Sequence, residues 1–506
     1  MTLALTHSVA LQGLEGHLVT IEVDIADGLP GYALLGLPDA ALSESRDRVR
    51  SAIVNCGEVW PNRKVTVSLS PAWLPKSGSS FDLAICIALL SAHDTVPRDR
   101  IAELLFLGEL SLDGRIRSVR GVLPALMAAY KAGVRTAVVP AANYEEAQLM
   151  QSMTIVPMEH LKQVLRWLRT GEREVVQEID LQWEQTDTRL DFADVAGQSA
   201  ARLAAEIAAI GGHHILLIGP PGAGKTMIAE RIPTIMPALS IEQALEVTAV
   251  HSIAGTLTQR SPLSLLAPIV SPHHTTTRIA MVGGGSHVIK PGACSLAHYG
   301  VLFIDEAPEC GPGVLDSLRQ PLESGTVTIA RSVGNLTFPA QFLLVLAANP
   351  CPCGKFTGRG HNCTCTSQQV RRYLGKLSGP LMDRIDLRVQ VEPVGRVDMA
   401  RNELGETSET IRQRVINARA IAEKRFAGMG WSLNSQIPAR ALRSTFQPER
   451  KAMNFLHDEL DREQITARGL HKIIRTSWSF ADLHGHPVPT MQDVEAAHAM
   501  RGKVEA

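Results

Sequence analysis

Apolar and polar residues alternate with two different periods along the chain. One period is typical of β-strands and the other of α-helices. Residues 21–25 and 64–69 alternate in steps of two, which predicts half-buried β-strands. Residues 40–55 carry apolar positions among charged ones at the spacing of an amphipathic helix, and residues 81–92 are almost wholly apolar, as in a buried helix. Interleaved strands and helices predict an α/β domain over residues 1–170.

A polar, acidic stretch without clear periodicity follows at residues 171–192 and predicts an interdomain linker. Residues 193–395 form the second predicted domain. Short apolar runs there, at residues 215–218, 301–304 and 342–348, predict buried strands. The second domain is therefore also expected to be α/β.

The pattern becomes helical over residues 396–506. Residues 411–426 place apolar positions on one face of a helix and basic positions on the other, and residues 469–483 and 493–500 predict further helices. We expect an all-α domain. The basic face is expected to be solvated, with a DNA-facing surface as the alternative.

Composition excludes several classes of protein. The chain of 506 residues has 50 basic and 51 acidic residues, so any contact with nucleic acid must come from a local patch. No apolar run approaches the roughly 20 residues needed to span a bilayer, and the N-terminus lacks a signal peptide. These features predict a cytoplasmic protein.

A phosphate-binding loop follows the strand at residues 215–218. It consists of Gly219, Pro220, Pro221, Gly222, Ala223, Gly224, Lys225 and Thr226. Glycines let backbone N–H groups surround a polyphosphate, and the following helix adds the positive end of its dipole. Lys225 is expected to reach the β- and γ-phosphates, and Thr226 to complete a Mg²⁺ shell, which predicts ATP and Mg²⁺ as cofactors.

Polar residues end the two later strands of the same domain. Asp305 is expected to hold the Mg²⁺ shell, and Glu306 to polarise the water that attacks the γ-phosphate. Asn349 is placed to hold that water from the other side. Taken alone, Asn349 also suits a cap of the turn before Pro350.

Four of the eight cysteines are crowded into two Cys-x-Cys pairs, Cys351 with Cys353 and Cys363 with Cys365. Four close thiolates match a tetrahedral site for a soft metal, most simply structural zinc. The usual zinc spacing is Cys-x₂-Cys, so reduced thiols and a redox disulfide remain alternatives, with His361 as a spare ligand.

The first domain resembles the proteolytic domain of Lon-type proteases, from Lys76 to Ser80 and again over residues 108–140. In that resemblance Ser80 falls at the nucleophile, but Leu123 occupies the position of the lysine base. A serine without a base is a poor nucleophile, so we expect a Lon-like fold without peptidase activity. Lys76 is the alternative base, and Asp82 is expected to serve the fold.

Several longer motifs carry a closer resemblance. They are Pro272-His273-His274-Thr275, Val282-Gly283-Gly284-Gly285, Pro291-Gly292, Ser295-Leu296-Ala297-His298, the run from Gly300 to Glu306, the run from Asn349 to Gly354 and the run from Ser378 to Asp386. With them the whole chain resembles the ComM/YifB family of bacterial AAA+ ATPases, relatives of the magnesium chelatase ATPase subunit. The resemblance implies a Lon-like domain, a central αβα sandwich and a helical lid.

The family resemblance also implies a hexameric ring with ATP at each subunit boundary. Arg384 resembles the arginine finger, and Arg468 the second sensor arginine; composition alone would make each a surface salt bridge. Residues 325–339 predict a β-hairpin that faces the pore in related ring helicases. Arg331 on it is a candidate DNA contact or an exposed arginine. His273 and His274 are expected to point apart, in a structural or substrate-contacting role.

This resemblance implies an ATP-dependent hexameric motor whose partner is single-stranded or branched DNA. Family members are associated with DNA branch migration, which extends the joint between incoming single strands and the chromosome in natural transformation. A chelatase-type motor that remodels a partner protein is the first alternative. An ATP-fuelled Lon-like protease is the second.

Overall fold

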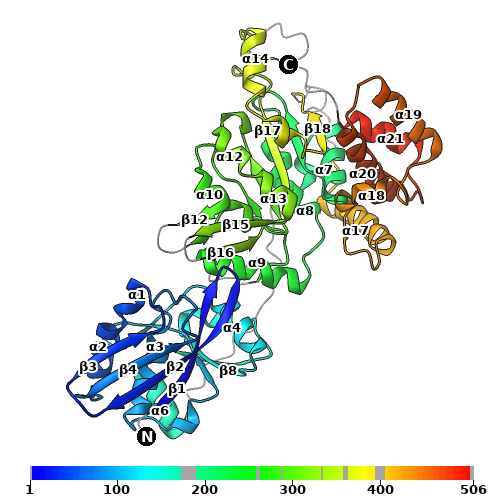
Figure 1. Ribbon diagram of the computed structural model, residues 1–506. Helices are drawn as coiled ribbons and strands as arrows, with labels where there is room; N and C mark the ends of the chain where they lie inside the picture. Colours follow the sequence, from blue (N-terminus) through cyan, green and yellow to red (C-terminus); the bar gives the residue numbers. More distant parts are fainter. Residues whose placement is uncertain are drawn as a thin grey trace. The chain divides into compact units, whose positions relative to one another are not determined.

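The computed structural model of the chain divides into two compact units (Figure 1). It describes residues 3–172, 190–257, 263–285, 289–331, 334–356, 363–393 and 405–501. Unit 1 comprises Met1–Glu184, Ala244–Ser264 and Thr328–Phe338, and unit 2 comprises Gln185–Gln243, Leu265–Val327 and Pro339–Ala506. Most of the predicted linker, residues 173–189, lies outside the described residues.

Unit 1 is built on a seven-stranded sheet with the order β3-β4-β2-β1-β5-β8-β9. Its strands are β1 (Ala4–Gln12), β2 (Glu15–Ala26), β3 (Gly31–Leu35), β4 (Lys64–Ser70), β5 (Leu104–Phe106), β8 (Thr136–Pro140) and β9 (Thr154–Met158). β1 and β2 pair antiparallel, whereas β5, β8 and β9 run parallel. Both strands predicted from period-two alternation are present, within β2 and β4.

Helices cover this sheet. They are α1 (Ala40–Ser43), α2 (Ser45–Asn55), α3 (Asp82–Ala92), α4 (Val122–Lys131), α5 (Tyr144–Ala147) and α6 (Leu161–Thr170). Every residue of α3 is buried, as its apolar composition predicts, and the helix packs against β1 and β2. The helix predicted over residues 40–55 is divided at Glu44 into α1 and α2.

Unit 2 is built on a five-stranded parallel sheet with the order β11-β14-β17-β10-β18. Its strands are β11 (Ile269–Val270), β14 (Val301–Ile304), β17 (Leu343–Ala348), β10 (Ile215–Ile218) and β18 (Leu387–Gln390). The four residues of β10 and the six of β17 are all buried, as continuous apolar strands require. Because the strands are parallel, the loops that follow β10, β14 and β17 meet at one edge of the sheet.

Helices α7 (Ser199–Gly211) and α8 (Lys225–Ile235) pack against this sheet and against each other. A helical region follows, with α17 (Ser408–Arg425), α18 (Ala439–Leu442), α19 (Arg450–Asp461), α20 (Ala467–His484) and α21 (Met491–Ala499). The sequence pattern missed α19. One hydrophobic core joins the sheet, α7 and α8 to the helical region. In the described part of the chain, no helix combines the length and apolar character needed to cross a membrane.

The basic face of α17 matches its prediction as a solvated surface only in part, because Lys424 is exposed whereas three arginines contact neighbouring helices. Arg414 pairs with Glu206 at 2.7 Å, Arg419 donates to the Ala209 carbonyl at 2.9 Å, and Arg425 pairs with Asp482 at 2.6 Å. Burial lowers the pKa of Arg419 to about 10. These arginines attach α17 to α7 and α20, so they serve the fold of unit 2.

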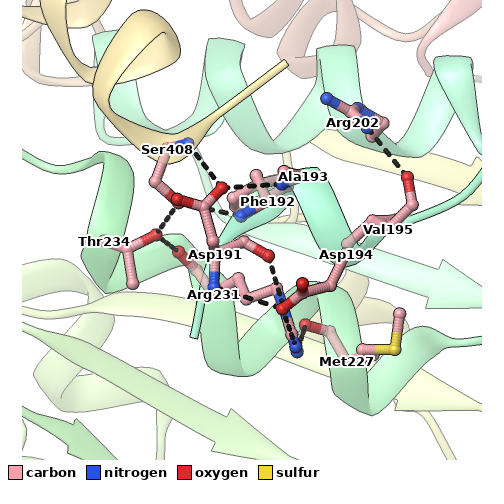
Figure 2. Close-up of polar contacts among 10 residues, drawn as sticks. All are labelled: Asp191, Phe192, Ala193, Asp194, Val195, Arg202, Met227, Arg231, Thr234 and Ser408. Carbon is pink, nitrogen blue, oxygen red and sulfur yellow. Dashed lines mark hydrogen bonds and ion pairs between the residues drawn. The ribbon is translucent and has the colours of Figure 1, made fainter. Parts of the chain in front are cut away.

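The end of the predicted linker is part of unit 2, as Figure 2 shows. Phe192 is fully buried, and its N–H donates to Ser408 Oγ at 2.9 Å. Arg231 on α8 donates to the Asp191 carbonyl at 2.7 Å and to the Asp194 carboxylate at 2.8 Å. Asp191 also accepts a hydrogen bond from the Ser408 N–H at 2.9 Å. The segment therefore connects the helix of the phosphate loop to the start of α17.

Candidate nucleotide-binding site

The phosphate loop leaves the carboxyl end of β10 and enters α8. Gly222 and Gly224 have φ angles of 77° and 91°, in the left-handed region that favours glycine. A Cβ atom on Gly219 would lie 2.2 Å from the Val391 carbonyl oxygen, so this position also requires glycine. The predicted order of strand, loop and helix is confirmed.

Lys225 is the first residue of α8, and its side chain lies inside the loop. Its Nζ donates to the carbonyls of Gly219 at 2.7 Å and Pro220 at 2.9 Å, and to Asn349 Oδ1 at 3.2 Å. Burial lowers the pKa of Lys225, while the nearby carboxylates of Asp305 and Glu306 oppose that shift. The structure thus brings the predicted phosphate-binding lysine and the predicted water-holding amide together.

Thr226 and Asp305 meet beside the loop. Thr226 Oγ1 donates to Asp305 Oδ2 at 2.9 Å, and the Glu306 N–H donates to Asp305 Oδ1 at 2.8 Å. A hydroxyl and a carboxylate oxygen at this separation are the hard oxygen ligands that Mg²⁺ prefers. The two residues therefore fit a shared Mg²⁺ shell.

Glu306 has a partner that the sequence did not predict. His274 Nδ1 lies 3.4 Å from Glu306 Oε2. His274 follows β11, which pairs parallel with β14, and Glu306 follows β14, so the two turns meet at the same edge. The signal that could have identified His274 was its position just after a strand neighbouring that of Glu306.

The prediction that His273 and His274 point apart was wrong. Their rings stack with centroids 4.1 Å apart and an interplanar angle of 34°. The two residues lie in an irregular segment that turns at His274 and Thr275, where side chains do not alternate as they do along a strand. His273 therefore supports the ring that faces Glu306.

Arg384 and Arg468 lie close to one another. Arg384 pairs with Glu323 on α13 (Arg319–Ser324), and Arg468 pairs with Asp383 at 2.9 Å. Burial lowers the pKa of Arg384, and the positive charge of Arg468 contributes to the same shift. The structure thus brings the predicted arginine finger and the predicted sensor arginine together.

These two arginines lie far from their own phosphate loop. Arg384 comes just before β18, whereas the loop comes just after β10. The two strands are parallel neighbours with Ile215 paired to Leu387 and Ile218 to Gln390. Arg384 therefore lies at the amino edge of the sheet and Lys225 at the carboxyl edge, with the length of a four-residue strand, about 13 Å, between the edges.

The four clustered cysteines follow Asn349 along the chain and lie close to one another. Cys351 Sγ lies 3.4 Å from Cys353 Sγ and 3.6 Å from Cys363 Sγ, and all four sulfurs, that of Cys365 included, lie within 4.8 Å of one another. Tetrahedral zinc with Zn–S bonds of about 2.3 Å separates its sulfurs by about 3.8 Å, so this set fits the metal.

The local backbone supports the cysteine cluster. The Lys355 and Thr364 backbone N–H groups lower the pKa of Cys353 to about 5, whereas the pKa values of Cys363 and Cys365 beside it are raised, so the thiolate is favoured at Cys353. A Cβ on Gly354 would lie 2.6 Å from Pro221 Cδ, so the turn of the cluster touches the loop itself. His361, the spare ligand, lies outside the described residues.

The residues of unit 1 that resemble protease positions make structural contacts. Leu123 is fully buried in α4. Lys76 is 1% exposed, and its Nζ donates to the Leu69 carbonyl at 2.9 Å and to the Pro71 carbonyl, so these two carbonyls hold the ammonium group inside the fold. Asp82 is buried and pairs with Arg48 at 2.7 Å, as expected of a structural residue.

The predicted hairpin is present as β15 (Thr326–Arg331) and β16 (Gly334–Pro339). Arg331 ends the first strand, but its side chain lies outside the described part of the chain. Its role as a DNA contact stays a prediction.

Three family models match most of the chain. The family model described as magnesium chelatase, subunit ChlI, matches residues 191–399. A model of the C-terminal part of that subunit matches residues 405–501, and a third ChlI model matches residues 21–143.

Several relatives extend over nearly the full chain. The uncharacterized protein Rv2897c of Mycobacterium tuberculosis is 48% identical, over 99% of both chains. Competence protein ComM of Haemophilus influenzae is 39% identical, over 96% of this chain and 94% of its own length. The uncharacterized protein YifB of Escherichia coli is 37% identical, over 99% of this chain and 97% of its own length.

A shorter match supports the predicted Lon-like homology. Lon protease 1 of Myxococcus xanthus is 29% identical over 165 residues, which is 30% of this chain and 20% of the protease. The predicted fold class is confirmed by this match, the parallel sheet of unit 2 and the helical region that follows it. The chain belongs to the ComM/YifB family of magnesium-chelatase-like AAA+ ATPases.

Proposed function

We propose that this protein is a cytoplasmic, ATP-dependent motor that assembles as a homo-hexameric ring and drives branch migration on DNA. The position of Arg384 supports this proposal most directly. An arginine finger must reach the transferred phosphate, but Arg384 lies at the sheet edge opposite its own phosphate loop. An arginine in this position is suited to the nucleotide of a neighbouring subunit, and each ATP site would then be completed by a second copy of the chain.

Each residue around the loop has a separate role in the proposed reaction. Lys225 exchanges the carbonyls of Gly219 and Pro220 for phosphate oxygens when ATP binds. Thr226 and Asp305 would hold Mg²⁺, which would supply positive charge against the charge that develops on the phosphates. Glu306 orients the attacking water and accepts its proton.

Two further residues act on this water and on its base. Asn349 holds the water from the side opposite the loop. His274, 3.4 Å from Glu306, fixes the direction of that carboxylate before the nucleotide arrives. The neighbour's Arg384, with Arg468 beside it, stabilises the transferring phosphoryl group.

Two features support DNA as the partner, namely the name of a relative and the β15–β16 hairpin. The name of the Haemophilus relative assigns that protein to competence. The β15–β16 hairpin carries Arg331, which we expect to contact the phosphates of single-stranded or branched DNA in the pore. On this basis the motor would integrate incoming single strands during natural transformation and recombination.

Two measurements test the proposal. The first is the steady-state rate of ATP hydrolysis with and without single-stranded or forked DNA, and the second is strand displacement on a three-way junction. We expect DNA to stimulate hydrolysis and ATP plus DNA to convert the protein into hexamers on a sizing column. The Lys225→Ala protein is the control for contaminating ATPases. Hydrolysis indifferent to DNA, with no strand displacement, would contradict the proposal.

A second candidate function is a chelatase-type motor that remodels a partner protein. The matches of the magnesium chelatase models to residues 191–399 and 405–501 favour it. In that case hydrolysis would respond to a protein cofactor and ignore DNA. A Lon-like protease has no support from unit 1, because Leu123 and Lys76 are both buried in structural roles.

A further inference from the structure

A second group of side chains of the types that bind metals lies at the end of α20, apart from the cysteine cluster. His484 is the last residue of α20, His486 follows it across Gly485, and Asp493 lies in the first turn of α21. One ligand atom from each side chain lies within 4.8 Å of the other two. We propose that His484, His486 and Asp493 bind a divalent transition-metal ion, independently of the proposed motor function.

The Asp493 carboxylate organises both imidazole rings. It is fully buried, and its two oxygens accept hydrogen bonds from His484 Nδ1 at 2.8 Å and His486 Nδ1 at 2.7 Å. Two nitrogens and a carboxylate thus already converge at separations close to those of adjacent ligands around one ion. When the ion binds, each Nδ1 gives up the hydrogen bond to the carboxylate and becomes a metal ligand. The proton of each ring moves to Nε2, so both rings stay neutral.

Hydrogen bonds and a glycine turn hold the three side chains in place. The Thr490 backbone N–H and hydroxyl both donate to Asp493 Oδ2, at 2.9 Å and 2.8 Å, which fixes the carboxylate as outer-shell partners do in metal sites. Gly485 has a φ of 74° and turns the chain between the histidines, whose ring centroids are 5.5 Å apart.

The exposure of the two histidines and the type of the ligand atoms determine which ions the site can bind. The side chains of His484 and His486 are 48% and 35% exposed, so the ion can enter from solvent and water can complete its coordination. Imidazole nitrogen favours zinc, nickel and copper, whereas Ca²⁺ and Mg²⁺ select sites made of oxygen. Because its ligands come from α20 and α21, the bound ion would join the two helices.

Calorimetric titration of the full chain with Ni²⁺ tests the proposal, with the cysteine cluster left intact in every variant. We expect the His484→Ala, His486→Ala double variant to lose one binding site. The His498→Ala protein, which lacks a histidine of α21 outside the proposed site, should keep that site. Asp493→Asn retains an oxygen for the Thr490 N–H and should weaken Ni²⁺ binding at this site at least 10-fold.

A second measurement needs no variant. Ni²⁺ should protect His484 and His486 of the wild-type chain from acylation by diethyl pyrocarbonate, as mapped by mass spectrometry, and leave His498 reactive. The proposal is overturned if the double variant binds as many Ni²⁺ ions as the wild type, or if Ni²⁺ does not protect the two rings.

Discussion

The Lys225 ammonium lies 3.2 Å from the Asn349 amide oxygen, although 124 residues separate the two along the chain. They meet because β10 and β17 are adjacent parallel strands, paired from Ile215 with Val345 to Ile218 with Ala348. Residues that leave the carboxyl ends of such strands share one edge of the sheet. The amide thus meets the lysine where a γ-phosphate would be cleaved.

Replacing Lys225 by Ala should lower the rate of ATP hydrolysis about 10²–10³-fold, because the variant loses the cation that stabilises charge on the phosphates. Steady-state phosphate release measures this change. Lys451→Ala, which removes an exposed lysine of α19, is the matched control and should hydrolyse ATP like the wild type. Equal rates for the two variants would argue against the assigned loop.

Arg384→Ala should reduce hydrolysis about 10³-fold or more, the range known for arginine fingers. Since the arginine is expected to serve a neighbour, adding variant subunits to wild-type protein should lower the rate by more than dilution alone. Arg412→Ala removes an arginine of α17 that pairs with Glu409 and should have no such effect. If the Arg384→Ala protein hydrolysed ATP at the wild-type rate, the shared-site model would fail.

Cys363→Ser should abolish the binding of one zinc ion per chain, because a tetrahedral thiolate site does not tolerate the loss of a ligand. Elemental analysis of protein purified without chelator measures zinc content. We also expect slower ATP hydrolysis, because Gly354 of the same turn touches Pro221 of the loop. Cys56→Ser, in unit 1, should retain full zinc content, and a metal-free wild-type protein would rule out the site.

His214 should make the stability of unit 2 depend on pH. Burial lowers the pKa of His214 from 6.5 to about 4, and its Nδ1 accepts a hydrogen bond from the Leu344 N–H at 3.1 Å. Between these two pH values the unfolded chain binds the extra proton and the folded chain does not. The free energy of unfolding should therefore fall by about 3 kcal/mol as pH decreases from 6.5 to 4.

The His214→Asn variant keeps an acceptor for the Leu344 N–H but cannot titrate. Urea denaturation at several pH values should show a shallower pH dependence than in the wild type. Identical slopes for the two proteins would show that the imidazole does not stay neutral in the folded state.

Ser80→Ala should leave ATP hydrolysis unchanged, and both proteins should fail to degrade an unfolded substrate such as casein. The physical reason is the absence of a base, because Leu123 is apolar and the Lys76 ammonium is held by the Leu69 and Pro71 carbonyls. Degradation by the wild type that disappears in the variant would restore the protease alternative.

Much of the fold could be predicted from apolar and polar patterns that involve only neighbouring residues in the sequence. The period-two strands of unit 1, the buried helix α3 and the apolar strands β10, β14 and β17 follow from residues adjacent in sequence. By contrast, α17 was expected to present a basic surface. Its partners Glu206, Ala209 and Asp482 lie 57 to 210 residues away, so its pattern alone could not reveal them.

Residues adjacent along the chain were enough to assign the chemistry of the phosphate loop and the strand ends, because a loop of consecutive residues contains its own geometry. That His274 faces Glu306 and that Arg384 lies at the edge opposite Lys225 became evident in the folded chain alone. Both relationships depend on the strand order β11-β14-β17-β10-β18. That order arises from packing between distant segments, which no local pattern encodes.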